Sequence, residues 1–351
     1  MPQSYDYLII GQGIAGTVLS YTLLEAGQSV LVIDQPQEYS TSKVAAGLFN
    51  PITGRKPTKT WLGEELFPFL HKFYPELEKA AKASFFFPTP IFVPFDSVEK
   101  QNNWLSRSAE PGYPRFIEGF SPKKYQNFLH ADHGGITLRH SGYVHTRRML
   151  HAFREVLKED GRLVEKRLRP GDISIAENGI EWEGYRAKKA IFCEGIQNRL
   201  NPYFDWLDYR PAKGEILKLE IPDAPFQEIV NRGCWMIPQP DGKFRVGSNY
   251  DRSTDPEPTE KGKQQVLDKV QALTPLPYEV IGHEAAIRPA TYDRRPFIGL
   301  HPEHPQLGLF GGLGSKGISL APYFAEHFAK HLLEGQELMP EVRLDRKKKK
   351  K

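Results

Sequence analysis

Apolar positions at the start of the chain follow a strand pattern, then a helix pattern, then a strand pattern again. Residues 5–10 are largely apolar and end at a glycine, which predicts a buried strand. Residues 17–26 are rich in helix-forming types and precede Gly27, which suits the end of a helix. Residues 29–33 form a second apolar run. This order predicts a βαβ unit, which requires parallel strands.

Later segments follow other patterns. A helix is predicted over residues 147–158 with Thr146 as its cap, and strands are predicted near 163–168 and at 190–193. Apolar runs on both sides of Pro240-Asp241-Gly242 predict an antiparallel hairpin. The chain then returns to a strand, a glycine loop and a helix with an apolar stripe, between residues 285 and 335.

The fold class that these patterns predict is α/β, with two domains built from discontinuous segments. A Rossmann-like domain is expected over residues 1–60, 141–204 and 282–345. A mainly antiparallel β-sheet domain with helices is expected over residues 61–140 and 205–281, because residues 61–140 show no second βαβ pattern. Residues 346–351 are expected to be a basic, disordered tail.

Charge and composition narrow the class of protein. The net charge is +4, but six positive charges lie in residues 346–351, so the rest of the chain carries a net charge of −2. No apolar stretch is long enough to span a membrane. The N-terminus lacks the basic start of a secretion signal, and there are only two cysteines, Cys193 and Cys234. A cytoplasmic protein without a disulfide framework is expected.

A glycine motif lies at the first predicted turn. Gly11-Gln12-Gly13-Ile14-Ala15-Gly16 has the G-x-G-x-x-G spacing, follows a strand and opens a helix. Asp34 ends the next strand, about 20 residues on, where an acid binds ribose hydroxyls. Glycines in this motif allow a tight turn, close approach of a diphosphate and close helix packing, while the helix N-terminus attracts the phosphates. The alternative is a glycine-rich turn in an ordinary α/β core.

Four ordered segments resemble the FAD-dependent D-amino-acid oxidase (DAO) superfamily, which includes the glycine oxidases. They are residues 41–51 (TSKVAAGLFNP), 191–195 (IFCEG), 287–299 (IRPATYDRRPFIG) and 311–318 (GGLGSKGI). The resemblance implies a Rossmann-like FAD-binding domain and non-covalent FAD, since no cysteine follows Cys234 as a donor for covalent attachment. No histidine, cysteine or acid spacing typical of a metal site is present.

The glycine motif and the resemblance together predict a set of cofactor-binding residues. These residues are Gly11, Gly13, Ile14, Ala15, Gly16, Asp34, Gln35, Thr41, Ser42, Ala46, Gly47, Leu48, Cys193, Glu194, Gly195, Arg288, Gly312, Gly314, Ser315, Lys316, Gly317 and Ile318. The final glycine loop precedes a helix, whose positive N-terminal end would stabilise negative charge on the reduced ring.

Three of the residues are candidates for catalysis or substrate contact. The resemblance implies that Arg288 binds a substrate carboxylate, which suits its planar guanidinium; the alternative is a structural arginine paired with Asp293 or another acid. Lys316 stabilises the reduced ring or is a solvated loop lysine. Trp235 stands where the family has an active-site tyrosine. It walls the pocket or is a core residue, and it cannot replace a phenol, which argues against a simple D-amino acid substrate.

The function that follows is oxidation of the C–N bond of an amino acid or secondary amine by hydride transfer to flavin N5, with oxygen or an unknown carrier as electron acceptor. Residues 46–51 and 314–317 are also similar to the FAD domain of the bifunctional tRNA 5-methylaminomethyl-2-thiouridine biosynthesis protein. That similarity implies an alternative, the conversion of a carboxymethylaminomethyl group on a tRNA wobble uridine, with tRNA as partner. A third possibility is a flavin-binding protein without turnover.

Overall fold

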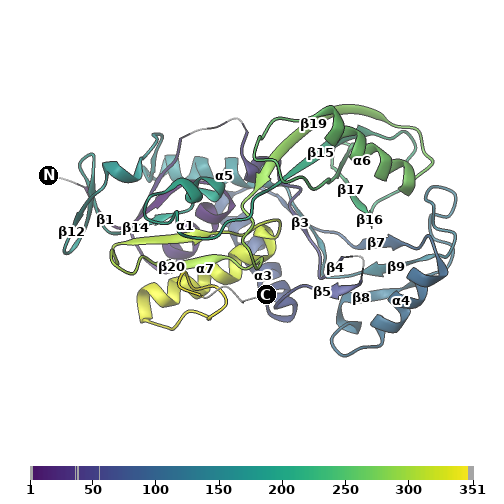
Figure 1. Ribbon diagram of the computed structural model, residues 1–351, viewed down its shortest axis with the longest axis horizontal. Helices are drawn as coiled ribbons and strands as arrows, with labels where there is room; N and C mark the ends of the chain where they lie inside the picture. Colours follow the sequence, from purple (N-terminus) through teal and green to yellow (C-terminus); the bar gives the residue numbers. More distant parts are fainter. Residues whose placement is uncertain (1–2, 36, 38, 55, 347–351) are drawn as a thin grey trace.

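A computed structural model describes residues 3–35, 37, 39–54 and 56–346 of the chain. Two eight-stranded sheets lie toward opposite ends of an elongated molecule (Figure 1). The fold is mixed α/β, as the sequence predicted. Among the described residues, no helix has the length and apolar character needed to cross a membrane.

The first sheet contains the predicted βαβ unit. Its order is β11-β2-β1-β14-β13-β12, and β21 pairs with both β14 and β20. Strands β2, β1, β14, β21 and β11 run parallel, and the others are antiparallel additions. The strand bounds are β1 (Gln3–Ile10), β2 (Val30–Ile33), β11 (Leu163–Val164), β12 (Ser174–Ala176), β13 (Gly179–Trp182), β14 (Tyr185–Phe192), β20 (Phe297–Leu300) and β21 (Leu307–Gly311).

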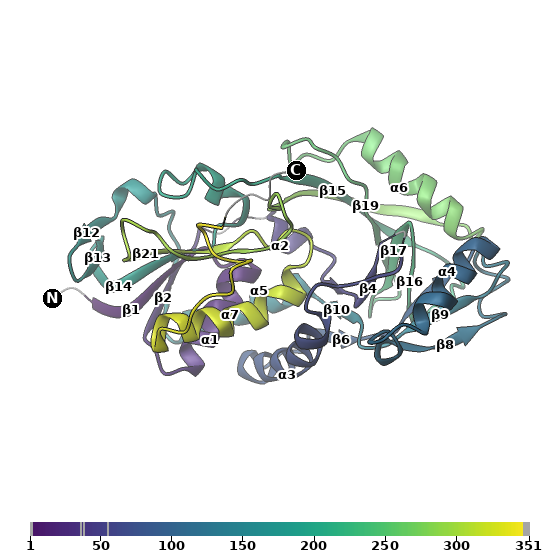
Figure 2. The same ribbon diagram turned by 60° about the horizontal axis from the view of Figure 1, so that its bottom comes forward.

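Four long helices pack together beside this sheet (Figure 2). They are α1 (Ile14–Glu25), α3 (Gly63–Ala81), α5 (Thr146–Glu159) and α7 (Gly317–Glu334). The buried stripe that the sequence predicted for α7 includes Phe324 and Phe328, which are fully buried. The second half of β1, residues 7–10, and all of β2 are buried, and both runs are continuously apolar.

The second sheet is mainly antiparallel, with the order β19-β15-β18-β17-β16-β7-β9-β8. Only the β16–β7 pairing is parallel among its described strands. Helix α6 (Glu260–Leu273) buries its apolar stripe on one face of this sheet. The strand bounds are β7 (Ile91–Pro94), β8 (Ile117–Ser121), β9 (Gly135–Leu138), β15 (Ala212–Glu220), β16 (Ile229–Arg232), β17 (Cys234–Pro238), β18 (Phe244–Gly247) and β19 (Glu279–Arg288).

The remaining elements include two small sheets, two helices and three 3-10 turns. A three-stranded sheet has the order β3-β10-β6, and β4 pairs with β5. The bounds are α2 (Thr41–Val44), α4 (Val98–Ser108), β3 (Leu48–Phe49), β4 (Ile52–Thr53), β5 (Thr58–Lys59), β6 (Phe86–Pro88) and β10 (Gly142–Val144), with 3-10 turns η1 (Pro114–Phe116), η2 (Pro170–Asp172) and η3 (Gly195–Leu200).

Several local predictions need correction. Helix α1 begins at Ile14, not at residue 17, so the last glycine of the motif lies inside its first turn. His145, not Thr146, caps α5; Thr146 lies within the helix and its hydroxyl donates to the Ala45 carbonyl. The strand expected over 163–168 ends at Val164.

The domain division stays a prediction, but two of its boundaries meet continuous structure. The boundary between residues 281 and 282 falls inside β19, which pairs with β15 along its whole length. Helix α3, which was assigned to the second domain, packs against α5 and α7 beside the first sheet.

Arg346 was wrongly assigned to a disordered tail. Its side chain is only 6% exposed and forms an ion pair with Asp293, with Nε 2.9 Å from Oδ2. The guanidinium also lies 3.9 Å from the centre of the Phe297 ring. A long cationic side chain is buried here because an acid and an aromatic ring both face it. The rest of the expected tail, residues 347–351, lies outside the described residues.

Candidate functional site

The glycine motif forms a tight turn between β1 and α1. Gly11 has a φ of +97°, and its N–H donates to the Ile33 carbonyl over 2.8 Å. A Cβ on Gly16 would lie 1.8 Å from the Gly11 carbonyl oxygen, so no larger residue fits in the first turn of the helix. Gly13 is extended and makes no side-chain cap. The first N–H groups of α1 therefore point out of the turn without helical partners.

A second helix N-terminus meets the first. A Cβ on Gly317, at the start of α7, would lie 3.7 Å from Cγ2 of Ile14, at the start of α1. The Ser42 hydroxyl of α2 accepts a hydrogen bond from the Ile14 N–H over 3.0 Å. The positive ends of two helix dipoles and a hydroxyl thus converge on one place, an arrangement that favours a phosphate or another anion.

Acidic side chains lie at the carboxyl ends of β2 and β14. Asp34 accepts from the Gln12 N–H over 2.9 Å, and its other oxygen accepts from Arg154 over 2.8 Å. Burial raises the pKa of Glu194 to about 7; nearby Arg167 lowers it and the charge of Asp34 raises it. Two carboxyl groups at this end of the parallel sheet match the place where ribose hydroxyls bind in Rossmann-like domains.

Arg288 and Trp235 lie on the second sheet. Arg288 is the last residue of β19, and its guanidinium lies across Gly214 on the neighbouring strand, where a Cβ would overlap it. Trp235 on β17 faces Gly247 on β18 in the same way, at 3.0 Å from the position of a Cβ. Both candidate side chains therefore depend on a glycine in the adjacent strand.

The partners of Arg288 are neutral. Its Nη1 donates to the Lys213 carbonyl over 3.0 Å, and its Nη2 donates to the Ser248 hydroxyl and the Asn249 carbonyl. Burial lowers its pKa. Asp293, the expected structural partner, pairs with Arg346 instead.

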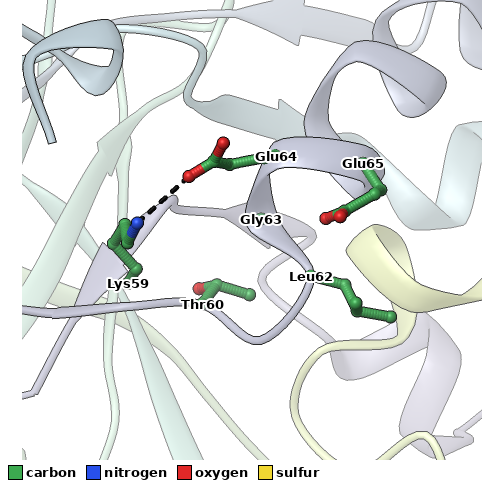
Figure 3. A pocket seen from close by; sticks show the side chains of 6 residues that line it. All are labelled: Lys59, Thr60, Leu62, Gly63, Glu64 and Glu65. Carbon is green, nitrogen blue, oxygen red and sulfur yellow. Dashed lines mark hydrogen bonds and ion pairs between the residues drawn. The ribbon is translucent and has the colours of Figure 1, made fainter. Parts of the chain in front are cut away.

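Lys316 is partly buried at the N-terminal cap position of α7. Its Nζ donates to Oγ1 of Thr60 over 2.8 Å, so it is not a solvated loop lysine. Burial lowers the pKa of Lys316 to about 8, and the charges of Arg295 and Arg294 lower it further. Thr60 also borders a cavity of about 210 Å³ at the start of α3, where Lys59 and Glu64 form an ion pair (Figure 3).

A family model described as "FAD dependent oxidoreductase", the DAO model, matches residues 6–331. The chain belongs to the DAO family. Its cofactor is FAD.

Relatives of this DAO-family protein include enzymes named for several substrates. The tRNA 5-methylaminomethyl-2-thiouridine biosynthesis bifunctional protein MnmC of Marinobacter nauticus is 24% identical over 93% of this chain, which spans 55% of that protein. Glycine oxidase from Geobacillus kaustophilus superposes with a TM-score of 0.78 at 19% identity, covering 96% of each chain. Iminodiacetate oxidase from Chelativorans sp. BNC1 superposes with a TM-score of 0.79 at 21% identity, covering 97% of this chain and 98% of that one.

The residues of the site fit an adenine dinucleotide. The N-terminus of α1 and Ser42 suit its diphosphate, Asp34 suits its ribose, and the N-terminus of α7 suits the flavin ring. Asn198 is fully buried after β14 and lies beside the buried Tyr209 hydroxyl, and neither side chain makes a hydrogen bond of good geometry among the described residues. Buried polar atoms of this kind usually meet a ligand or water. FAD supplies a hydride acceptor when bound.

Most of the predicted cofactor residues lie around this place. Gln35 and Ser315 are exposed. Gly312 and Gly314 both have positive φ in the loop before α7, and the Gly314 N–H donates to the Pro289 carbonyl beside Arg288. Gly47 also has positive φ, and a Cβ there would lie 1.9 Å from the Val144 carbonyl oxygen. The contact of each residue with FAD remains a prediction.

Three hydrogen bonds of the site were not predicted from the sequence. Arg154 donates to Asp34, Lys316 donates to Thr60, and Arg245 donates to the Ala45 carbonyl at the end of α2. The signal for Arg154 was its place on α5 beside the buried Leu150 and Phe153, where a charged side chain needs a partner. Nothing local marked Thr60 or Arg245.

Proposed function

We propose that this DAO-family protein oxidises the C–N bond of an amino acid or secondary amine that carries a carboxylate. The observation that carries the proposal is the state of Arg288. Within the part of the chain that the structure describes, this partly buried guanidinium has only uncharged acceptors and forms no ion pair. A partly buried cation without a counter-charge is costly, and a substrate carboxylate would supply that charge.

The donors of Arg288 limit how a carboxylate binds. A guanidinium has five N–H donors, and three of them are used by Lys213, Ser248 and Asn249. In this proposal, a ligand carboxylate takes the donors that remain. The three fixed contacts hold the side chain in place before the ligand arrives, which reduces the entropy lost on binding.

Other residues shape the rest of the pocket in this proposal. Trp235 forms an apolar wall over Gly247. Amine oxidation requires a neutral substrate nitrogen. Because burial lowers the pKa of Lys316 to about 8, its amine is partly neutral in mildly basic solution, and it is suited to hold or move a proton there.

The relatives support the same class of substrate. Glycine oxidase and iminodiacetate oxidase are named for amines that carry carboxylates, and both share the fold over nearly the whole chain. Their identities of 19% and 21% leave the particular amine open.

The direct test is anaerobic reduction of the bound flavin by a panel of amines. The panel contains amino acids, N-methylglycines, cyclic imino acids and iminodiacetate, each paired with its carboxamide. We expect bleaching of the flavin band by at least one carboxylate and much weaker reduction by its amide. Reduction by amides at equal rates would contradict the proposal. Mixing the reduced protein with oxygen then shows whether oxygen or a carrier is the electron acceptor.

A second candidate is oxidation of a modified uridine in tRNA, which the similarity to MnmC along 93% of the chain favours. This candidate predicts that the protein binds tRNA with an affinity that falls steeply with salt. It also predicts an altered wobble nucleoside when the encoding gene is deleted. Unchanged nucleosides in the deletion strain would exclude it.

A further inference from the structure

We propose that Arg245 is a positioning residue that fixes α2 against the antiparallel sheet. It thereby also fixes the diphosphate site, which is formed by Ser42 of α2 and the N-terminus of α1. Arg245 lies in β18, and its side chain is 17% exposed. Its Nη1 donates to the Ala45 carbonyl over 2.9 Å, and its Nη2 donates to the Val44 carbonyl over 2.5 Å. These carbonyls end α2, where the helix itself supplies no donors.

Helix α2 needs such contacts because it is very short. It has four residues, far fewer than an isolated helix needs for stability. At its start, the Thr41 hydroxyl donates to the Ile287 carbonyl of β19 over 2.7 Å. From its first turn, the Ser42 hydroxyl accepts from the Ile14 N–H at the tip of α1. Helix α2 thus connects β19 of the second sheet with the N-terminus of α1.

The segment that follows α2 is held from its other side. The Thr146 hydroxyl donates to the same Ala45 carbonyl over 3.2 Å, and the Val144 N–H donates to the Gly47 carbonyl over 3.0 Å. The segment is therefore clamped between α5 and β18. Loss of the Arg245 contacts would release one side of this clamp and leave the other intact.

An acid compensates the charge of Arg245. Oε2 of Glu284 on β19 lies 3.8 Å from its Nη2, and Oε1 of Glu284 pairs with Arg147 on α5. Three charged side chains from three elements therefore meet where the two sheets approach each other. The planar fork of an arginine reaches two successive carbonyls at once, which the single ammonium of a lysine cannot do.

Arg245 also lies close to the proposed substrate pocket. It lies two residues before Gly247, the glycine that faces Trp235. Its side chain and Trp235 are on the same face of the sheet, because Trp235 opposes Gly247 and side chains alternate along β18. Arg245 therefore lies between Gly247, which faces Trp235, and the end of α2.

The test uses the full chain and measures the bound cofactor, so it needs no substrate and does not depend on the proposed function. We compare Arg245→Gln, Arg245→Lys and the wild type in FAD dissociation constant, flavin absorption spectrum and midpoint potential. Loss of two charge-assisted bonds is expected to weaken FAD binding about tenfold or more in Arg245→Gln. The FAD affinity of Arg245→Lys should lie between those of the wild type and Arg245→Gln. The flavin spectrum should be shifted in both variants.

Lys218→Gln is the matched control. Lys218 lies opposite Arg245 in the register of β15 and β18, but its ion pair with Asp241 is exposed. This variant should bind FAD as the wild type does. FAD binding by Arg245→Gln within twofold of the wild type, with an unchanged spectrum, would overturn the proposal, and so would an equal loss in Lys218→Gln.

A double variant separates positioning from general loss of folding. Ser42→Ala removes the contact of α2 with the Ile14 N–H at the start of α1. Because both side chains act through α2, the effects of Ser42→Ala and Arg245→Gln on FAD affinity should be less than additive. Strict additivity would contradict the coupling.

Discussion

The two ends of the site are built in different ways. At the nucleotide end, β1, α1 and β2 follow one another along the chain, and Gly11, Gly16 and Asp34 lie close together because the local turn brings them there. At the sheet end, Arg288 and Trp235 stand on separate strands, and each is seated on a glycine from a neighbouring strand. The nucleotide end is a local structure, whereas the sheet end depends on the register between strands.

This difference predicts how each end responds to substitution. A change in the local turn meets backbone atoms that cannot move, so its effect should be large and should fall on FAD binding. A change beside Trp235 on the sheet mainly meets a side chain that can shift, so its effect should be small and should fall on the substrate, whereas Arg245 on the same sheet contacts α2 and affects FAD.

The largest effect is expected for Gly16→Ala. Its Cβ would lie 1.8 Å from the Gly11 carbonyl oxygen, which is backbone. We expect a loss of about 3 kcal/mol or more in the free energy of unfolding, together with loss of FAD binding. Gly171→Ala is the control, because a Cβ there meets nothing within 4 Å. Denaturant unfolding and FAD titration measure both, and retention of tight FAD binding by Gly16→Ala would contradict the local account.

Arg346→Ala should have the next largest effect, because it removes the cation that pairs with Asp293 and leaves a cavity beside Phe297. We expect a loss of about 3 kcal/mol in the free energy of unfolding. Arg343→Ala removes a pair with Asp345 whose side chains are 49% and 65% exposed, so its cost should be about 0–1 kcal/mol. Equal melting temperatures for Arg346→Ala and Arg343→Ala would show that Arg346 contributes less to stability than the structure indicates.

Glu194→Gln should change the pH dependence of the apoprotein. Burial raises the pKa of Glu194 from 4.5 to about 7, so between these values the folded state binds a proton that the unfolded state does not. Wild-type stability should therefore gain from this group as pH falls from 7 toward 4.5, and glutamine removes that dependence. We expect the variant to be more stable at pH 8 by about 1–2 kcal/mol, with a smaller difference near pH 5.

Urea unfolding across this pH range makes the comparison. Glu177→Gln, at an exposed acid, is the control. A constant difference between Glu194→Gln and the wild type at all pH values would exclude the raised pKa.

The smallest effect is expected for Gly247→Ala. Its Cβ would lie 3.0 Å from the Trp235 ring and 3.2 Å from the Glu215 carbonyl oxygen, so the ring must shift by a few tenths of an ångström. KM for the substrate should change about threefold, while the FAD dissociation constant stays the same. Gly119→Ala on β8, where a Cβ meets nothing within 4 Å, should change neither. A change in FAD affinity for Gly247→Ala would mean that substitutions beside Trp235 also affect the nucleotide end of the site.

The same contrast explains how much the sequence could predict. The βαβ unit, the glycine turn, the hairpin at Pro240-Asp241-Gly242 and helix α7 could be predicted because their signals lie within a few neighbouring residues. The start of α1 was placed late because Gly16, a poor helix former, lies within the helix.

Long-range partners could not be predicted in this way. Arg154 pairs with an acid 120 residues away, Arg245 binds a carbonyl 200 residues away, and Lys316 binds a hydroxyl 256 residues away. The pairing of Arg346 with Asp293 was hidden by the lysines that follow it, which made the end of the chain resemble a solvated tail. Each of these contacts depends on the fold and not on local spacing.

The most direct test of the account is binding of acetate and acetamide to the FAD-loaded protein, followed by the flavin spectrum. These ligands have nearly the same shape and differ in charge, and neither is oxidised as an amine. If Arg288 is the counter-charge for a carboxylate, acetate should bind more tightly than acetamide, and Arg288→Gln should remove that preference. An unchanged preference for acetate in Arg288→Gln would contradict the central claim.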